Sequence, residues 1–164
     1  MLTLFNLMKL DEAINKRTSI RKFSDKKVRW DHILEAIDAA IKAPFSGNIN
    51  NLRFIIVQDK KLKFRLAECA QQDWIADASF IVVVCADYTP LEKIYNERAN
   101  IYGRQHAGAA IQNFLLKITD LKLASCWIGA FSDYYIKEAL KIPEHIEIEA
   151  LLPVGYAQPH IKIK

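Results

Sequence analysis

Apolar residues recur at two spacings along the chain, and these spacings separate the expected helices from the expected strands. Leu10, Ala13 and Ile14 fall on one helical face, so residues 9–17 are predicted to form a short helix. Later segments show comparable helical patterns. Further helices are therefore expected over residues 31–42, 60–72, about 91–122 and 133–142.

Runs rich in β-branched and aromatic residues predict the strands. The run SFIVVVCAD, residues 79–87, is apolar without alternation, which favours a strand buried on both faces. Three more strands are expected in RFIIVQD (53–59), SCWIGAF (125–131, running into a turn) and EIEALLPVGYA (147–157). Helices and strands together predict an α+β domain in which helices surround one sheet.

Composition limits the possible classes of function. The 164 residues suit one domain spanning 1–164, and a net charge of +4 without a long Lys/Arg run does not indicate nucleic-acid binding. Three separated cysteines without a CxxC pair suit reduced thiols, and four histidines lack metal-ligand spacing. The start has no signal-peptide pattern and no apolar run approaches the roughly 20 residues of a membrane span. We expect a cytoplasmic protein without a metal site.

The segment KRTSIRKFSD, residues 16–25, concentrates hydrogen-bond donors. Arg17 and Arg21 lie four residues apart with Ser19 between them, so two guanidinium groups and a hydroxyl could bind one phosphate monoester. Each charge-assisted bond would contribute roughly 1.5–3 kcal/mol. The alternative is a solvated helix end, where arginine favours the C-terminal dipole, and this segment alone favours that alternative.

Two further segments have the composition of ligand-binding loops. In APFSGNIN, Gly47 permits a positive φ, and Asn48 and Asn50 can bind the edge of an amide-like ring. In CWIGAF, Gly129 leaves a backbone N–H accessible to a flat ligand. A helix-ending loop and a core strand ending in a turn are the respective alternatives, and each is favoured when its segment is taken alone.

The chain's end adds two cations, and the chain as a whole offers no catalytic motif. Lys162 and Lys164 could pair with a phosphate, although a basic tail is the commoner explanation. Walker, GxGxxG and GxSxG motifs are absent, and no carboxylate pair or Ser–His–Asp set can be proposed from spacing. We therefore expect no catalytic side chain.

Taken in chain order, these segments resemble the FMN-dependent nitroreductase family, of which this chain would be a small, compact member. The likeness extends from about Leu10 to Ala157. It is carried by RTSIRKF, APFSGN, FIIVQD, WIADASFIVVVCAD, HAGAAIQNFLL, LASCWIGAF and LLPVGYA. The resemblance implies a mainly antiparallel sheet of four to five strands surrounded by helices, and a single FMN-binding domain over residues 1–164.

The resemblance also implies a role for each segment in holding FMN without a covalent bond. The segment that cradles the phosphate and reaches toward the flavin contains Arg17, Thr18, Ser19 and Arg21. The loop that the family presents from the partner subunit contains Ser46, Asn48 and Asn50. The turn beside the reactive ring contains Gly129 and Ala130, and the C-terminal phosphate contacts would be Lys162 and Lys164.

By the same resemblance the protein is a homodimer with FMN at the subunit interface. It would transfer reducing equivalents by a ping-pong reaction from NAD(P)H to a nitroaromatic, quinone or enone-like acceptor. The alternatives are a flavin store or sensor without turnover, and a reductive dehalogenase-like relative. The chain departs from the family pattern in three places. Asn50, Asn51 and Leu52 stand where many relatives have Gln-Pro-Trp, and His106 stands where many have an acidic residue. Some larger relatives have a basic residue near the position of Trp74.

Overall fold

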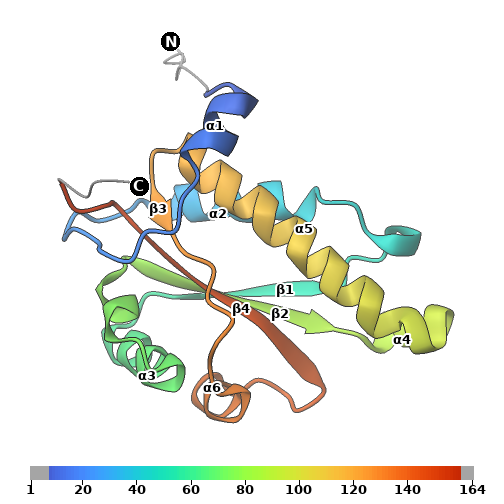
Figure 1. Ribbon diagram of the computed structural model, residues 1–164. Helices are drawn as coiled ribbons and strands as arrows, with labels where there is room; N and C mark the ends of the chain where they lie inside the picture. The colour runs from blue at the N-terminus through green and yellow to red at the C-terminus, as the bar shows by residue number, and fades with distance from the viewer. Residues whose placement is uncertain (1–7, 160–164) are drawn as a thin grey trace.

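A computed structural model describes residues 8–159 and places four antiparallel strands between helices (Figure 1). The strands are β1 (Leu52–Val57), β2 (Phe80–Asp87), β3 (Ala124–Ser125) and β4 (Ile146–Gly155). Their order across the sheet is β1-β2-β4-β3. The expected α+β architecture is confirmed, although β3 overlaps the predicted SCWIGAF strand only at Ser125.

Strand β2 is the centre of the sheet because it has neither a free edge nor a face in water. It pairs with β1 on one side and with β4 on the other, and a register shift at Val84/Cys85 interrupts the second ladder. Side chains alternate in direction along a strand, so β2 supplies both cores. Val82 and Val84 enter one core, whereas Ile81 and Val83 enter the other.

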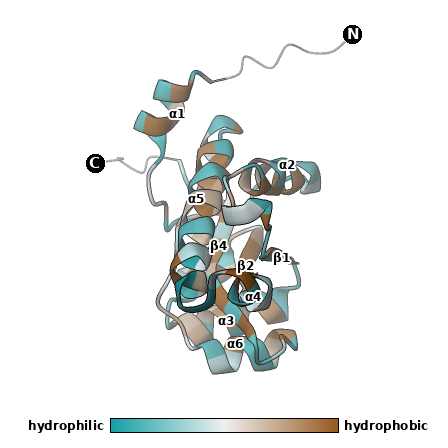
Figure 2. Ribbon diagram, turned by 90° about the vertical axis from the view of Figure 1, so that its right-hand side faces the viewer, coloured by the Kyte–Doolittle hydropathy of each residue, from teal (hydrophilic) through white to brown (hydrophobic). Residues whose placement is uncertain are grey.

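Two helical layers cover these two cores. Helices α2 (Trp30–Ile41) and α5 (Ala99–Asp120) cover one side, and α3 (Lys60–Ala70) and α6 (Asp133–Leu140) cover the other. Figure 2 shows hydrophobic residues on the sheet between the helices and hydrophilic residues on outward-facing helix turns. Within residues 8–159, no helix combines the length and hydropathy that a bilayer crossing needs.

The helix expected over residues 91–122 is two helices, which corrects the prediction of one long element. Helix α4 (Thr89–Tyr95) ends where Asn96 adopts a left-handed φ of 46°, and a 3-10 turn, η3 (Asn96–Arg98), leads into α5. A positive φ cannot continue a right-handed helix. Helical spacing on both sides of the break hid it from the sequence pattern. Helix α1 (Leu10–Lys16) and the 3-10 turns η1 (Ser46–Asn48) and η2 (Asp73–Asp77) complete the fold.

Helix α5 approaches Tyr88 closely because Gly103 has no side chain. A Cβ at Gly103 would overlap the Tyr88 ring. That ring is buried, and its hydroxyl donates a short hydrogen bond to Glu149 Oε1 on β4. Tyr88 therefore has little freedom to move away, and the packing of α5 on this side depends on glycine.

We predict that Gly103→Ala destabilises the protein, although alanine is the better helix former. Overpacking costs about 1–3 kcal/mol, which exceeds the roughly 0.5–1 kcal/mol gained in helix propensity. Urea unfolding monitored by circular dichroism measures the difference. The exposed Gln105→Ala on the same helix is the control and should leave stability nearly unchanged. Equal midpoints for both variants and the native protein would show that the Tyr88 contact does not constrain α5.

Candidate functional site

The segment KRTSIRKFSD (residues 16–25), the SCWIGAF segment and the end of strand β4 lie side by side in the structure. Ser19 forms a parallel bridge with Ser125 of β3, and the Ile20 N–H donates to the Ser125 carbonyl at 3.0 Å. The Ser24 N–H donates to the Tyr156 carbonyl at 2.8 Å. In Figure 1 this blue segment runs beside β3 and the end of β4. Backbone pairing thus brings together three regions that are far apart in the sequence.

Two apolar residues decide which side chains of segment 16–25 face the core and which face solvent. Ile20 and Phe23 are buried, and a Cβ at Gly155 would lie 2.6 Å from the Phe23 ring, so this glycine admits the ring. With Ile20 and Phe23 turned inward, Ser19 and Arg21 are exposed. Apolar anchoring of the segment therefore leaves its polar groups available to a ligand.

A pocket of about 120 Å³ lies beside this segment. Its wall contains three cations, Lys16, Arg17 and Lys122, with Lys16 paired to Glu12 at 2.6 Å. Lys122 adopts a left-handed φ of 58°, a conformation that commonly ends helices, and so turns the chain from α5 toward β3. The remaining lining residues are Thr18, Ile20, Leu115, Ile118, Thr119, Leu123, Ala124, Ser125 and Ala157.

Ser125 is the most informative residue of this pocket. Its side chain is 4% exposed, and its Oγ has no hydrogen-bond partner within residues 8–159. Buried hydroxyl groups are normally paired, because an unpaired one loses its bonds to water without replacement. An unpaired hydroxyl in a wall that also contains Arg17 and Lys122 suits a ligand rich in anionic or hydroxyl oxygens.

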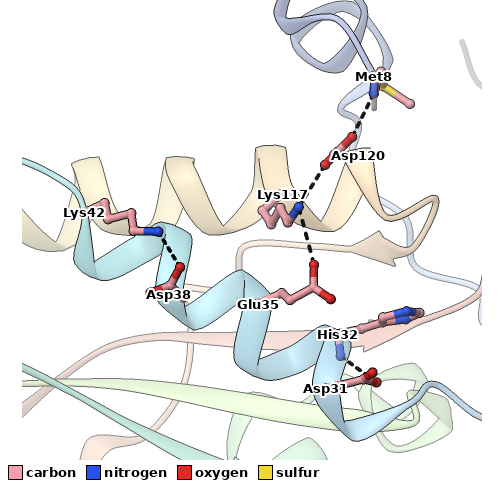
Figure 3. A network of polar contacts seen from close by, with 8 residues as sticks. All are labelled: Met8, Asp31, His32, Glu35, Asp38, Lys42, Lys117 and Asp120. Atoms are coloured by element: carbon pink, nitrogen blue, oxygen red, sulfur yellow. Dashed lines mark hydrogen bonds and ion pairs between the residues drawn. The ribbon is translucent and has the colours of Figure 1, made fainter. Parts of the chain in front are cut away.

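Helix contacts hold the walls of this pocket in place. Asp120, in the last turn of α5, accepts a hydrogen bond from the Met8 N–H at 3.0 Å (Figure 3). It also forms an ion pair with Lys117 at 3.0 Å. Lys117 also contacts Glu35 of α2 at 3.5 Å. Burial acts to lower the pKa of Lys117, but the hydrogen bonds and charges of Asp120 and Glu35 outweigh it and raise the pKa. The ion pairs link α2 to the end of α5, and the Met8 hydrogen bond attaches the segment just before α1.

The turn at Gly129 and Ala130 is open. Both residues are exposed, and a Cβ at Gly129 would meet nothing within 4 Å in the described chain. Just before the turn, Ile128 pairs with Leu151 of β4 through bonds of 3.1 and 3.0 Å in both directions. Trp127 is 42% exposed. A well-anchored backbone with free space beside it can accept a flat ligand, and the role of Gly129 and Ala130 beside the flavin stays a prediction.

The loop of residues 45–51 lies at the other end of α5. Ser46 contacts His106, whereas Arg17 shares its pocket with Ile118, which is about 18 Å further along the helix axis. In Figure 1 the turquoise η1 turn lies near the α4 end of α5, away from β3. One subunit therefore does not bring Ser46, Asn48 and Asn50 to the Arg17 pocket.

Within this loop, the expected positive φ at Gly47 is confirmed at 60°, and Asn48 follows at 57°. The Asn50 side chain accepts a hydrogen bond from the Leu52 N–H at 3.0 Å, so it caps the start of β1. Gly47 and Asn48 are exposed at the tip of the loop. Lys162 and Lys164 lie outside the described residues.

Sequence reasoning missed three polar residues near these places. Ser125 was visible as a hydroxyl within an apolar strand. Asn51 and His106 form a buried pair in which Asn51 Oδ1 lies 2.9 Å from His106 Nδ1. Their only signal was that both depart from the family pattern, and spacing could not indicate that residues 55 positions apart meet.

Known proteins resemble this chain over most of its length. The sequence model of the family described as "Nitroreductase family" matches residues 14–71 and 65–156. A curated protein of Archaeoglobus fulgidus, provisionally named NADH dehydrogenase/NAD(P)H nitroreductase, is 30% identical over 150 residues, which cover 88% of this chain and 83% of that protein.

Solved structures share the fold over nearly all of the chain. A nitroreductase family protein of Clostridium novyi NT superposes with a TM-score of 0.84 at 29% identity, covering 96% of this chain and 89% of that one. An FMN-dependent nitroreductase of Clostridium difficile R20291 gives 0.80 at 27%, covering 93% and 90%. The matching family model, the relative and the shared fold establish that this chain belongs to the nitroreductase family.

Proposed function

We propose that this protein binds FMN non-covalently and passes reducing equivalents from NAD(P)H to an electron-poor small molecule. The observation that carries the proposal is the unpaired Ser125 hydroxyl in a pocket lined by Arg17, Thr18 and Lys122. The similar protein from C. difficile is named as FMN-dependent, and the one from A. fulgidus carries NAD(P)H in its name. These names support the choice of cofactor and electron donor.

The pocket residues fit the phosphate and sugar-alcohol end of FMN. Arg17 is partly buried as a residue, so water would weaken its charge-assisted hydrogen bonds to a phosphate less than at a fully exposed site. The Thr18 and Ser125 hydroxyls can both donate and accept. Ser19 and Arg21 are exposed beside the pocket, and we assign them to the flavin end. Lys162 and Lys164 remain proposed phosphate contacts.

FMN, when bound, supplies the capacity to accept and release two electrons. The protein's own part is to bind, orient and tune. The Arg21 charge would favour the anionic form of the cofactor, and backbone N–H groups at Gly129 and Ala130 would hold the opposite edge of the ring. No side chain of this chain needs to act as nucleophile or general acid. The open turn leaves room for donor and acceptor to use one site in succession.

We further propose a homodimer in which loop 45–51 of one subunit completes the FMN site of the other. The separation of Ser46 and Asn48 from the Arg17 pocket within one chain supports this arrangement. Gly108 on α5 has free space around it in the described subunit, since a Cβ there would meet nothing within 4 Å. Small residues allow helices to approach closely, which suits a helix from a second subunit.

The first prediction from the proposed function concerns the cofactor and its phosphate. The purified protein should show the absorbance bands of oxidised flavin and release FMN on denaturation. Arg17→Ala should weaken FMN binding about ten- to a hundred-fold, because one charged contact contributes roughly 1.5–3 kcal/mol. Titration of FMN into the apo variants measures the affinities.

The matched control for this prediction is Arg29→Ala. Arg29 is exposed and pairs with Asp31, away from the pocket lining, so its loss should leave FMN affinity unchanged. Equal affinities for the two variants would assign Arg17 to a solvated helix end. A colourless protein that also takes up no added FMN would remove the basis of the proposal.

The second prediction separates turnover from storage. Steady-state oxidation of NAD(P)H should accelerate when a quinone or nitroaromatic compound is added, and initial rates against both substrates should give the parallel lines of a ping-pong reaction. A flavin store or sensor would retain its colour without catalysing this oxidation. A haloaromatic acceptor in the same panel tests the dehalogenase-like alternative through halide release.

The third prediction concerns the dimer. Sedimentation at micromolar concentration should give about twice the chain mass of 18.8 kDa. Gly108→Leu should weaken the dimer and FMN binding together, because the added side chain meets no atom of its own subunit. Glu138→Leu, at an exposed position on α6 across the sheet, is the control. A native monomer that still binds FMN tightly would contradict the assignment of loop 45–51 to the partner's site.

A further inference from the structure

Loop 45–51 rests on one buried histidine. His106, on α5, is 3% exposed, and its ring packs edge-on against Phe45 with centroids 5.1 Å apart. The Ser46 N–H donates to Nε2 at 2.8 Å, and Asn51 Oδ1 lies 2.9 Å from Nδ1. The two ends of the loop are thereby held by the two nitrogens of one imidazole.

These partners allow only one protonation state of the ring. A backbone N–H can only donate, so Nε2 must present its lone pair to Ser46. The proton of a neutral imidazole must then be on Nδ1, where it requires an acceptor. Asn51 Oδ1 is that acceptor. Asn51 is itself 1% exposed, and its backbone carbonyl accepts from the Asp87 N–H at 2.8 Å, which fixes its position at the start of β1.

Protonation would break this arrangement at Ser46. An imidazolium carries N–H groups at both nitrogens, so Nε2–H would face the Ser46 N–H without an acceptor. The Ser46 hydroxyl lies 3.1 Å from the same nitrogen and can accept in its place. The bond would therefore move from the Ser46 backbone to its side chain. The loop backbone would lose its attachment just before Gly47 and Asn48.

The surroundings favour the neutral ring. Burial is the cause that lowers the pKa of His106, and no charged neighbour contributes to the shift. Titratable groups on adjoining elements are Asp87 at the end of β2, Tyr95 at the end of α4 and Arg104 on α5 itself. The Asp87 carboxylate accepts from the Thr89 N–H, the Tyr95 hydroxyl lies beside Gly47, and Arg104 is exposed. None of them supplies a counter-charge to an imidazolium.

We propose that His106 is a positioning residue that holds loop 45–51 in its present shape only while the imidazole is neutral, so that mild acid releases the loop. The consequence for FMN rests on the proposed function, because there the loop of one subunit contacts the cofactor of the other. The release itself is a property of the single chain and does not depend on that assignment.

The test compares two substitutions of His106. Glutamine can accept from Ser46 and donate to Asn51, but it does not titrate, so His106→Gln should keep the loop in place at every pH. Phenylalanine fills similar space without either hydrogen bond, so His106→Phe should release the loop at every pH. His145→Gln, at an exposed position outside the loop, is the control for losing a histidine.

The first readout needs no cofactor. Amide exchange, expressed as protection relative to the free peptide so that intrinsic pH effects cancel, is measured for Ser46 between about pH 7.5 and about pH 5. Native protein and the His145 control should lose protection about threefold to tenfold as the ring titrates, since one hydrogen bond is lost. The Gln variant should remain protected, and the Phe variant should be unprotected throughout. Equal pH profiles for native protein and His106→Gln would overturn the proposal.

The second readout follows stability. Below the ordinary histidine pKa the unfolded chain takes up a proton more readily than the folded one, because folding lowers the pKa of His106. The free energy of unfolding should therefore fall with acid more steeply for native protein than for His106→Gln. If the two slopes coincide, His106 is not the titrating anchor.

The third readout is FMN affinity over the same pH range. A fall in native affinity that is absent in His106→Gln supports both the anchor and the loop's place at the cofactor. Loss of Ser46 protection without any change in FMN affinity supports the anchor and contradicts the loop's proposed contact with FMN. The measurements therefore distinguish failure of the His106 anchor from failure of the loop's proposed contact with FMN.

Discussion

The structure depends on the burial of strand β2 from Phe80 to Ala86. These residues are apolar on both faces, and both edges of the strand are paired, so it requires a neighbouring strand on each side and a helical layer on each face. The alternation of Val82 and Val84 with Ile81 and Val83 divides the interior into two cores. The sheet ends in β3, which contributes only two residues and leaves its outer edge to the segment around Ser19.

The candidate site follows from that arrangement. A short edge strand can take up an irregular segment by single bridges, and the segment of residues 17–24 uses Ser125 and the end of β4 in this way. Ile20 and Phe23 supply the apolar anchors, so Arg17 and Thr18 are left at the pocket that contains the unpaired Ser125 hydroxyl. Loop 45–51 is built differently, on a buried imidazole at the far end of α5.

The sequence predicted the layers and most elements, because periodicity reports which face of an element is buried. It predicted β2 most securely, since every residue between Ser79 and Asp87 is apolar. It did not predict the break at Asn96, because the residues on both sides keep helical spacing and a single positive φ leaves no trace in hydropathy. The convergence of Ser19 with Ser125, and of Asn51 with His106, depends on pairing between distant segments, which local patterns do not encode. Resemblance to a family assigned Ser19 and Gly129 to one cofactor site but did not name Ser125, and only the structure joined Asn51 with His106.

The most direct measurement of the central claim is a crystal structure of the protein grown with FMN. We expect the phosphate beside Arg17, an FMN oxygen within hydrogen-bond distance of Ser125 Oγ, and the ring beside Gly129 and Ala130. We also expect Ser46 and Asn48 of the partner subunit to lie against the flavin. FMN bound elsewhere, with Ser125 Oγ paired to protein or water and the pocket free of cofactor, would contradict it.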